Sequence, residues 1–345
     1  MTVARFETCV IFGGTGFIGI HLARHLLFQG MADRVFLADI APLDPASWPP
    51  EVGRALDVGK LSVVRVDVRQ PIDHPALPEH VDLIVNLAAI HREPGHEPFE
   101  YYETNLLGAE HICAWAELTG CEAVMFTSSI APYGPTEEPK DEDALPVPES
   151  AYGNSKLVAE KIHLAWQRGD RERRQLSIVR PGVVYGPGEG GNVSRLVRAV
   201  LHRYFIYTGN RPTRKAGGYV KELCHAMVCV WNWQREHGQH VALFNFTADP
   251  ALTMEEYVRA VCETAGVQRF VPAIPYPLLL GASYPIEVLS RILGIRQPVS
   301  PVRIRKLVRS NHIQPAFLRA IGYEYRYTTA QALADWQKER PEDWM

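Results

Sequence analysis

The sequence predicts an α/β fold: a doubly wound, mainly parallel sheet with helices on both faces. Short apolar runs alternate with amphipathic helical stretches, such as 17–29 and 104–118. Strands that are buried on both faces of a sheet have this uninterrupted apolar character. A glycine-rich turn, GGTGFIG, also joins the first run to the first helix. The predicted strands are 9–12, 35–38, 63–66, 83–87, 124–126 and 178–179.

Composition narrows the classes of function. The 345 residues are 46% hydrophobic and 22% charged, and the net charge is −3. These values are typical of a protein with a large core, and they predict neither a nucleic-acid nor a membrane partner. The six cysteines form no CxxC pair, and the chain runs directly from MTVARFET into its first apolar run. Reduced thiols and a cytoplasmic location are therefore expected.

The most apolar stretch is 276–294. Pro277, Pro285, Glu287 and Arg291 interrupt it, which makes it a poor membrane-spanning helix. We expect a buried helix or a wall of the substrate lobe there.

The glycine-rich turn has the spacing of a dinucleotide-binding loop. Gly13, Gly16 and Gly19 permit a tight turn, close approach to a pyrophosphate and close helix packing. The helix then begins at Phe17 and Ile18, where free N–H groups can meet the phosphates. The strand before the turn and the helix after it strengthen this interpretation.

Two acidic residues follow later strands. Asp39 closes the second predicted strand, twenty residues beyond Gly19. A carboxylate there can accept hydrogen bonds from the adenosine ribose and would repel a 2′-phosphate, so NAD is predicted in preference to NADP. Asp67, with Val68 beside it, is predicted to meet the adenine.

The motifs together resemble the extended short-chain dehydrogenases/reductases, in particular the NAD-dependent epimerase/dehydratase branch that acts on nucleotide sugars. The motifs that carry the resemblance are GGTGFIG, Asp39, NLAA (86–89), TSSIAPYG (127–134), Tyr152-x-x-x-Lys156 and RPGVVYGPG (180–188). The resemblance is strong over 8–190. It implies a Rossmann-like domain over 1–190, to which about 219–247 returns, and a smaller, mainly substrate-binding lobe over 191–345.

The resemblance also implies catalytic residues. Tyr152 matches the acid/base, and Lys156 matches the residue that lowers the pKa of that phenol and bonds the nicotinamide ribose. A free phenol titrates near 10, so it needs such help at neutral pH. Ser129 matches the residue that hydrogen-bonds the reacting oxygen.

Other family positions imply contacts with the cofactor. Leu87, Ala88 and Ala89 are expected beneath it, and Asn105 is expected to fix strand–helix packing beside it. The RPGVV segment brings Pro181 and Val183 to the same site.

The reaction is predicted to be epimerisation through a transient keto-sugar. The related 4,6-dehydratases carry an Asp-Glu pair after the hydroxyl residue, whereas Ile130 and Ala131 follow Ser129 here. Three alternatives stay open: a nucleotide keto-sugar reductase, a hydroxysteroid- or flavonoid-type dehydrogenase, and a non-enzymatic NAD-binding regulator.

Substrate contacts are predicted at Asn192, at Lys215, which replaces the family's phosphate-binding Arg, and at His91. Lys holds a phosphate as a point charge and not as a fork. The basic cluster Arg303, Arg305, Lys306 and Arg309 is either a solvated helix face or a phosphate clamp. The spacing of His91, His96 and Glu97 fits no standard metal site, so no metal is predicted.

The resemblance further implies a homodimer built from two long helices of each subunit. The predicted helices span 104–118 and 152–166, and Ile112, Trp115 and Leu164 are expected on their outer faces.

Overall fold

A seven-stranded parallel sheet forms the centre of the computed structural model, which describes residues 5–44, 48–93, 95–293 and 308–345. The strand order is β10-β7-β5-β4-β1-β2-β3. The chain winds outward from β1 in both directions, and the crossovers fill both faces, as the sequence predicted. The strands are β1 (Phe6–Phe12), β2 (Ala32–Asp39), β3 (Leu61–Arg65), β4 (Leu83–Asn86), β5 (Ala123–Thr127), β7 (Gln175–Pro181) and β10 (Val241–Phe246).

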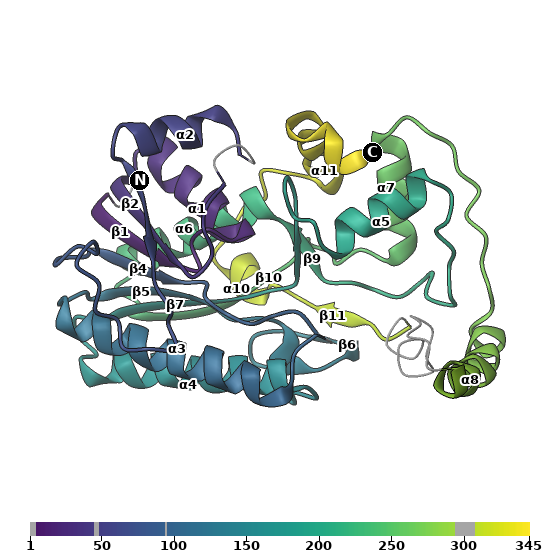
Figure 1. Cartoon of the computed structure of the whole chain (residues 1–345), viewed down its shortest axis with the longest axis horizontal. Helices are drawn as coiled ribbons and strands as arrows, with labels where there is room; N and C mark the ends of the chain where they lie inside the picture. The colour runs from purple at the N-terminus through teal and green to yellow at the C-terminus, as the bar shows by residue number, and fades with distance from the viewer. Residues whose placement is uncertain (1–4, 45–47, 94, 294–307) are drawn as a thin grey trace.

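Two helical layers cover the sheet. One face carries α3 and α4, which pack side by side, and the opposite face carries α1, α2 and α6 (Figure 1). Strand β1 alternates between the two cores: Cys9 and Ile11 belong to one, and Val10 and Phe12 to the other. The helices are α1 (Phe17–Phe28), α2 (Pro50–Asp57), α3 (Pro98–Leu118), α4 (Ala151–Gly169) and α6 (Val220–Glu236).

The remaining elements lie beyond the carboxyl ends of the strands (Figure 1). Two short strand pairs, three isolated bridges and a group of helices make up this part. The elements are β6 (Thr136–Lys140), β8 (Val183–Tyr185), α5 (Asn192–Leu201), β9 (Gly217–Tyr219), α7 (Met254–Thr264), α8 (Tyr276–Leu293), β11 (Asn311–Ile313), α10 (Ala316–Ala320) and α11 (Thr329–Glu339), with 3-10 turns at Ala131–Tyr133 and Pro341–Trp344.

The six predicted strands all occur, and their ends differ by a few residues. Helix α3 begins at Pro98, six residues before the predicted start, because Glu97 and Glu100 form a capping box around that proline. The seventh strand, β10, pairs with β7 and follows α6, so segment 219–247 contributes a helix and an edge strand to the sheet.

Of the two expectations for 276–294, the buried helix is wrong, and a wall of the substrate lobe stays a prediction. The segment does form α8, but Leu278, Tyr284 and Ile286 are exposed. The helix lies at the periphery of the molecule, away from the sheet (Figure 1). Within the described ranges, no helix is long and apolar enough to cross a bilayer. Arg303, Arg305 and Lys306 lie outside the described residues.

The residues predicted on the outer faces of the two long helices are also wrong. Ile112 and Trp115 point into the core, where the Trp115 ring meets Phe12 edge-on at 5.4 Å between centroids. Leu164 is partly buried against the same core. The large apolar residues that α3 and α4 expose are Phe99, Leu107, Leu118 and Val158. A dimer through these helices stays a prediction, and its interface would use that second set.

Candidate active site

The glycine loop after β1 leaves no room for side chains. Gly13 has a φ of +73°, and a Cβ atom there would lie 2.7 Å from the backbone nitrogen of Ala88. A Cβ on Gly19 would lie 2.5 Å from the carbonyl oxygen of Gly14. The turn therefore packs directly on the backbone that follows β4, so Gly13 and Ala88 line the same site.

We expect Gly13→Ala to destabilise the fold and weaken NAD binding, because the new methyl group meets backbone atoms at a positive φ. The loss should be about 1–3 kcal/mol, measured by urea unfolding. Gly53→Ala is the control, since Gly53 lies in α2 with open space around its Cβ position. That change should stabilise the protein by about 0.5–1 kcal/mol. Equal effects of the two changes would contradict the packing argument.

Helix α1 starts in a way that suits an anionic ligand. Its N-cap is Gly16, which provides no side-chain hydrogen bond to the first turn. The N–H groups of Phe17, Ile18 and Gly19 belong to that turn, where an α-helix has no internal acceptors for them. These donors and the positive end of the helix dipole fit the pyrophosphate of a dinucleotide.

The Asp39 carboxylate stands at the carboxyl end of β2, next to the glycine loop. One oxygen accepts a hydrogen bond from the Thr15 backbone N–H at 3.1 Å, and the other accepts from Ala41 N–H at the same distance. These bonds fix the carboxylate beside the loop, where the ribose of a dinucleotide on α1 would be recognised.

Asp67 is engaged by a neighbour within the chain. Its carboxylate accepts a two-pronged pair of hydrogen bonds from the Arg69 guanidinium, at 2.7 and 3.0 Å. This partner lowers the pKa of Asp67. Val68 is buried, and a Cβ on Gly108 would lie 2.9 Å from it. Val68 and Gly108 therefore form a close-packed wall beside Asp67.

Tyr152, Ser129 and Lys156 converge above β5. Helix α4 carries Tyr152 and Lys156 one turn apart, and Ser150 caps its N-terminus by accepting from Gly153 N–H. The Ser129 hydroxyl is close enough to the Tyr152 phenol to lower the pKa of that phenol through hydrogen bonding. The Lys156 ammonium is buried, 2% exposed, and lies 4.4 Å from the centroid of the Phe126 ring. The structure thus brings the three predicted catalytic residues into one site.

Burial dominates the proton equilibria of this site. It raises the pKa of Tyr152, and the hydrogen bond from Ser129 offsets part of that rise. Burial also lowers the pKa of Lys156 to about 7, against the opposing attraction of Glu160. Burial therefore opposes the predicted depression of the Tyr152 pKa, because it disfavours both the charged phenolate and the charged ammonium.

Asn105 ties the loop after β4 to helix α4. Its side-chain oxygen accepts from Ile90 N–H at 2.9 Å, and its amide donates to the Ser155 hydroxyl at 2.8 Å. Ser155 in turn donates to the backbone carbonyl of Tyr152 at 2.9 Å. This chain of bonds ties Ile90, which follows Leu87, Ala88 and Ala89, to the first turns of α4, and such packing is the role predicted for Asn105.

Sequence reasoning missed a buried ionic network behind Lys156. Glu160, one turn further along α4, binds Arg180 of β7 through two hydrogen bonds at 2.6 and 2.8 Å. Ser128 donates to the same carboxylate, and Arg180 also donates to the phenolic oxygen of Tyr133. These residues belong to TSSIAPYG, RPG and the helix of Tyr152, where Glu160 follows Lys156 at the four-residue spacing that puts both on one helix face.

A second missed group is Asn86 with His163. Asn86 ends β4, and its amide lies 3.2 Å from His163 Nε2. The His163 ring stacks on Phe126 at 4.1 Å between centroids, and burial lowers its pKa to about 4. With that pKa, the His163 imidazole is neutral at pH 7. Lys156 is therefore the cation that contacts the Phe126 ring.

The remaining predicted residues, Pro181 and Val183 for the cofactor and His91, Asn192 and Lys215 for the substrate, are dispersed. Pro181 and Val183 lie at the β7–β8 junction, and His91 is exposed in the loop after β4. Asn192 begins α5 and accepts from Arg195 at 2.7 Å. Lys215 donates to the backbone carbonyl of Arg309 at 2.6 Å, and burial lowers its pKa. This bond uses one of the three N–H donors of the Lys215 ammonium.

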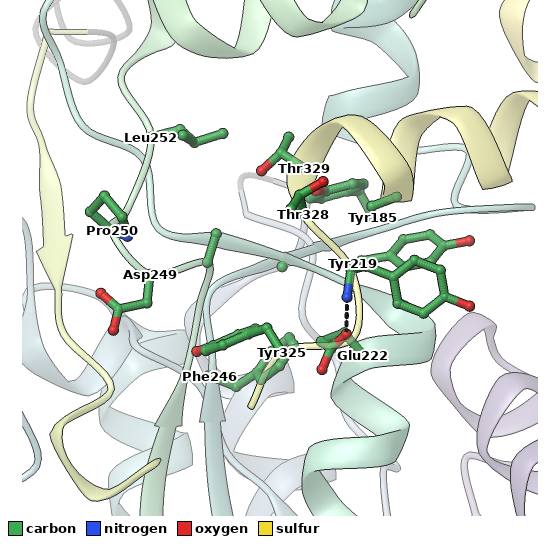
Figure 2. Close-up of a pocket in the computed structure, with 14 residues that line it drawn as sticks. Tyr185, Tyr219, Glu222, Phe246, Asp249, Pro250, Leu252, Tyr325, Thr328 and Thr329 are labelled. Carbon is green, nitrogen blue, oxygen red and sulfur yellow. Dashed lines mark hydrogen bonds between the residues drawn. The ribbon is translucent and has the colours of Figure 1, made fainter. Parts of the chain in front are cut away.

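An aromatic cavity of about 290 Å³ lies elsewhere, between β9 and α11. In Figure 2, Asp249, Pro250 and Leu252 stand on one side of it and Tyr185 and Tyr219 on the other. None of its lining residues belongs to the predicted catalytic or cofactor set.

Glu222 forms part of the wall of this cavity. Its carboxylate accepts from the Tyr323 hydroxyl and from the backbone N–H groups of Arg326 and Tyr327. The Tyr327 bond is drawn in Figure 2. These hydrogen bonds hold the segment 323–327, which leads into α11, against α6.

The fold, the glycine loop and the carboxylate on β2 define a Rossmann-like dinucleotide-binding enzyme. The chain belongs to the NAD dependent epimerase/dehydratase family, which it matches over residues 9–243. This family is NAD-dependent, and the loop and α1 provide the phosphate-binding groups that NAD requires. Within the described residues, no group of three or more His, Cys, Asp or Glu side chains is placed to hold a metal ion.

The chain is similar to characterised proteins along nearly its full length. It is 28% identical, over 334 residues, to N-acetyl-alpha-D-glucosaminyl-diphospho-ditrans,octacis-undecaprenol 4-epimerase of Escherichia coli O157:H7, covering 95% of this chain and 93% of that protein. It is 26% identical to a 3-beta-hydroxysteroid dehydrogenase of Mycolicibacterium neoaurum, with 94% and 89% covered.

Solved structures share the fold. The UDP-glucuronic acid 4-epimerase from Bacillus cereus, in complex with NAD, superimposes with a TM-score of 0.73 at 16% identity. The match covers 98% of this chain and all of that chain.

Proposed function

We propose that this enzyme is an NAD-dependent nucleotide-sugar epimerase, which inverts a hydroxyl-bearing carbon through a transient keto-sugar. The convergence of Tyr152, Ser129 and Lys156 beside the glycine loop carries the proposal. When bound, NAD supplies the hydride acceptor that later returns the hydride to the sugar. Full-length similarity to a diphospho-sugar 4-epimerase supports epimerisation over the alternatives.

The protein residues move and hold the proton. As phenolate, Tyr152 removes the proton from the sugar hydroxyl while hydride leaves the carbon that bears this hydroxyl. The Ser129 hydroxyl donates to the reacting oxygen and keeps it beside the phenol. A charged Lys156 favours phenolate, and the negative charge of Glu160 favours that charged form of Lys156. Tyr152 then returns the proton to the oxygen after hydride reaches the opposite face.

The proposal is tested by incubating the purified enzyme with a panel of nucleotide sugars, with and without added NAD, and separating the products. We expect one sugar to give a mixture of two epimers without accumulation of NADH. Net NADH formation from a sterol or a sugar would instead identify a dehydrogenase. Consumption of NADPH with a keto-sugar would identify a reductase.

The same chemistry on a polyprenyl-diphosphate-linked sugar is a second candidate. It is favoured by the Escherichia coli relative, whose substrate is a sugar diphosphate attached to a long lipid. Adding a polyprenyl-diphospho-N-acetylglucosamine to the panel distinguishes the two candidates. We expect the enzyme to convert either the nucleotide sugar or the lipid-linked sugar, but not both, at a useful rate.

Asp39 is expected to set the choice of cofactor. Asp39→Asn keeps the acceptor for Thr15 N–H but removes the negative charge that repels a 2′-phosphate. The preference for NAD over NADP should therefore narrow, as measured by calorimetric titration of both. Asp33→Asn, at the opposite end of β2, is the matched control and should leave the preference unchanged. A wild-type preference for NADP would contradict the assignment.

A further inference from the structure

A row of buried hydrogen bonds joins helix α4 to the end of strand β4. His163 on α4 is 0% exposed, and Asn86 on β4 is 2% exposed. His163 Nδ1 lies 2.8 Å from the Ala159 carbonyl oxygen, and His163 Nε2 lies 3.2 Å from the Asn86 side-chain nitrogen. The Asn86 side-chain oxygen accepts from the Ala88 N–H at 3.1 Å. The row therefore runs from the catalytic helix to the backbone that follows β4.

The partners in this row determine where the imidazole carries its proton. A carbonyl oxygen only accepts hydrogen bonds, so His163 Nδ1 must donate to Ala159. The Ala88 N–H only donates, so the Asn86 oxygen must face Ala88 and the Asn86 amide must face His163. His163 Nε2 is therefore the acceptor, and a second proton there would meet the N–H groups of Asn86. The row is complete only with a neutral imidazole.

Two members of the row contact the candidate active site. The Ala88 backbone nitrogen would lie 2.7 Å from a Cβ on Gly13, so Ala88 packs directly against the glycine loop. The His163 ring stacks on Phe126 at 4.1 Å between centroids, and the Lys156 ammonium lies 4.4 Å from the same Phe126 centroid. Loss of His163 would therefore release both the ring beside Lys156 and the backbone beside Gly13.

We propose that neutral His163 is a positioning residue, which holds the glycine loop and Lys156 in the relative arrangement that hydride and proton transfer require. Both ring nitrogens are engaged and the side chain is fully buried, so His163 is not itself a proton carrier. It acts through Asn86 on the backbone after β4 and through Phe126 on Lys156. This inference rests on the proposed function, in which Lys156 favours the phenolate form of Tyr152.

The test compares two substitutions that each keep one property of the imidazole. His163→Phe keeps a ring against Phe126 but leaves the buried Asn86 amide without its acceptor. His163→Gln loses the ring, but its side-chain oxygen can accept from Asn86. We expect His163→Phe to bind NAD about tenfold less tightly in calorimetric titration, because the unpaired amide turns away from Ala88. Turnover should fall about 10²-fold. His163→Gln should recover most of the NAD affinity.

His237 provides the matched control. Its Nδ1 also bonds the carbonyl oxygen of Trp233, four residues earlier, at 2.9 Å, and its ring stacks on the Trp233 ring at 4.7 Å between centroids. It is exposed at the end of α6, outside the candidate active site. His237→Phe should therefore bind NAD like the wild type. The proposal is overturned if His163→Phe also binds like the wild type, or if His163→Gln binds no better than His163→Phe.

NMR spectroscopy of the unaltered protein provides a test that does not depend on the folding of any variant. With both ring nitrogens of histidine isotopically labelled, and without NAD, His163 should show a protonated Nδ1 and an unprotonated Nε2 at neutral pH. Contacts with the Phe126 ring protons assign the signals. A protonated Nε2 would overturn the proposal. The tautomer and the NAD affinities do not involve a sugar. If they agree with expectation while no nucleotide sugar is converted, the proposed function has failed and the positioning role at the NAD site has not.

Discussion

Tyr152→Phe is expected to reduce turnover by at least about 10²–10⁴-fold, because it removes the only proton-transferring atom that the proposal places at the sugar oxygen. The ring, the backbone and the Ser155 bond to the Tyr152 carbonyl all remain. NAD binding should therefore be nearly unchanged. Steady-state turnover and calorimetric titration of NAD separate the two effects.

Tyr101→Phe is the matched control for that change. The Tyr101 ring lies 6.2 Å from the Tyr152 ring, centroid to centroid, and its hydroxyl donates to the Arg92 carbonyl. The same atom is removed next to the site, without loss of the proposed base. Turnover should stay close to that of the wild type. If both Phe variants lose turnover equally, Tyr152 has no special part in proton transfer.

Arg180→Met should destabilise the protein by about 3–5 kcal/mol, since it leaves the buried Glu160 carboxylate without its cation. The midpoint of urea unfolding measures the loss. Adding Glu160→Leu to Arg180→Met should recover part of it, because the second change removes the unpaired charge. A double variant less stable than Arg180→Met alone would contradict this account.

Arg173→Met serves as the control for Arg180. Arg173 also forms ion pairs, with Asp170 and Glu122, but its side chain is exposed. Water solvates the partners when Arg173 is removed, so the urea midpoint should barely move. The comparison of Arg180→Met with Arg173→Met tests whether burial, and not the number of ion pairs, determines how much stability is lost when the Arg is removed.

The elements closest to the glycine motif were predictable because local patterns determine them. Apolar runs, turn glycines and the spacing of Tyr152 and Lys156 each express a local constraint, and the six strands follow from it. The Glu160–Arg180 pair was missed because it forms only when α4 packs back on β7. Asn86 and His163, 77 positions apart, meet for the same reason. Such contacts depend on the crossover, which sequence spacing does not display.

The errors at α8 and α3 share a different cause. Apolar character predicted burial for α8. It does not distinguish an apolar side chain that packs on the core from one that is exposed at the surface. In α3, apolar residues lie on more than one side, so the rotation of the helix could not be read from them. Ile112 and Trp115 were therefore assigned to the wrong face.

The Glu222 carboxylate links the completion of the fold to the end of protein synthesis. It is buried on α6, yet all three groups that donate to it come from residues 323–327, about a hundred positions later. Trp336, which is fully buried, comes later still. While the ribosome is extending the chain, α6 carries a carboxylate whose partners have not been made. A chain terminated before Tyr323 would keep every residue predicted to be catalytic and still expose that defect to the quality-control proteases of the cell.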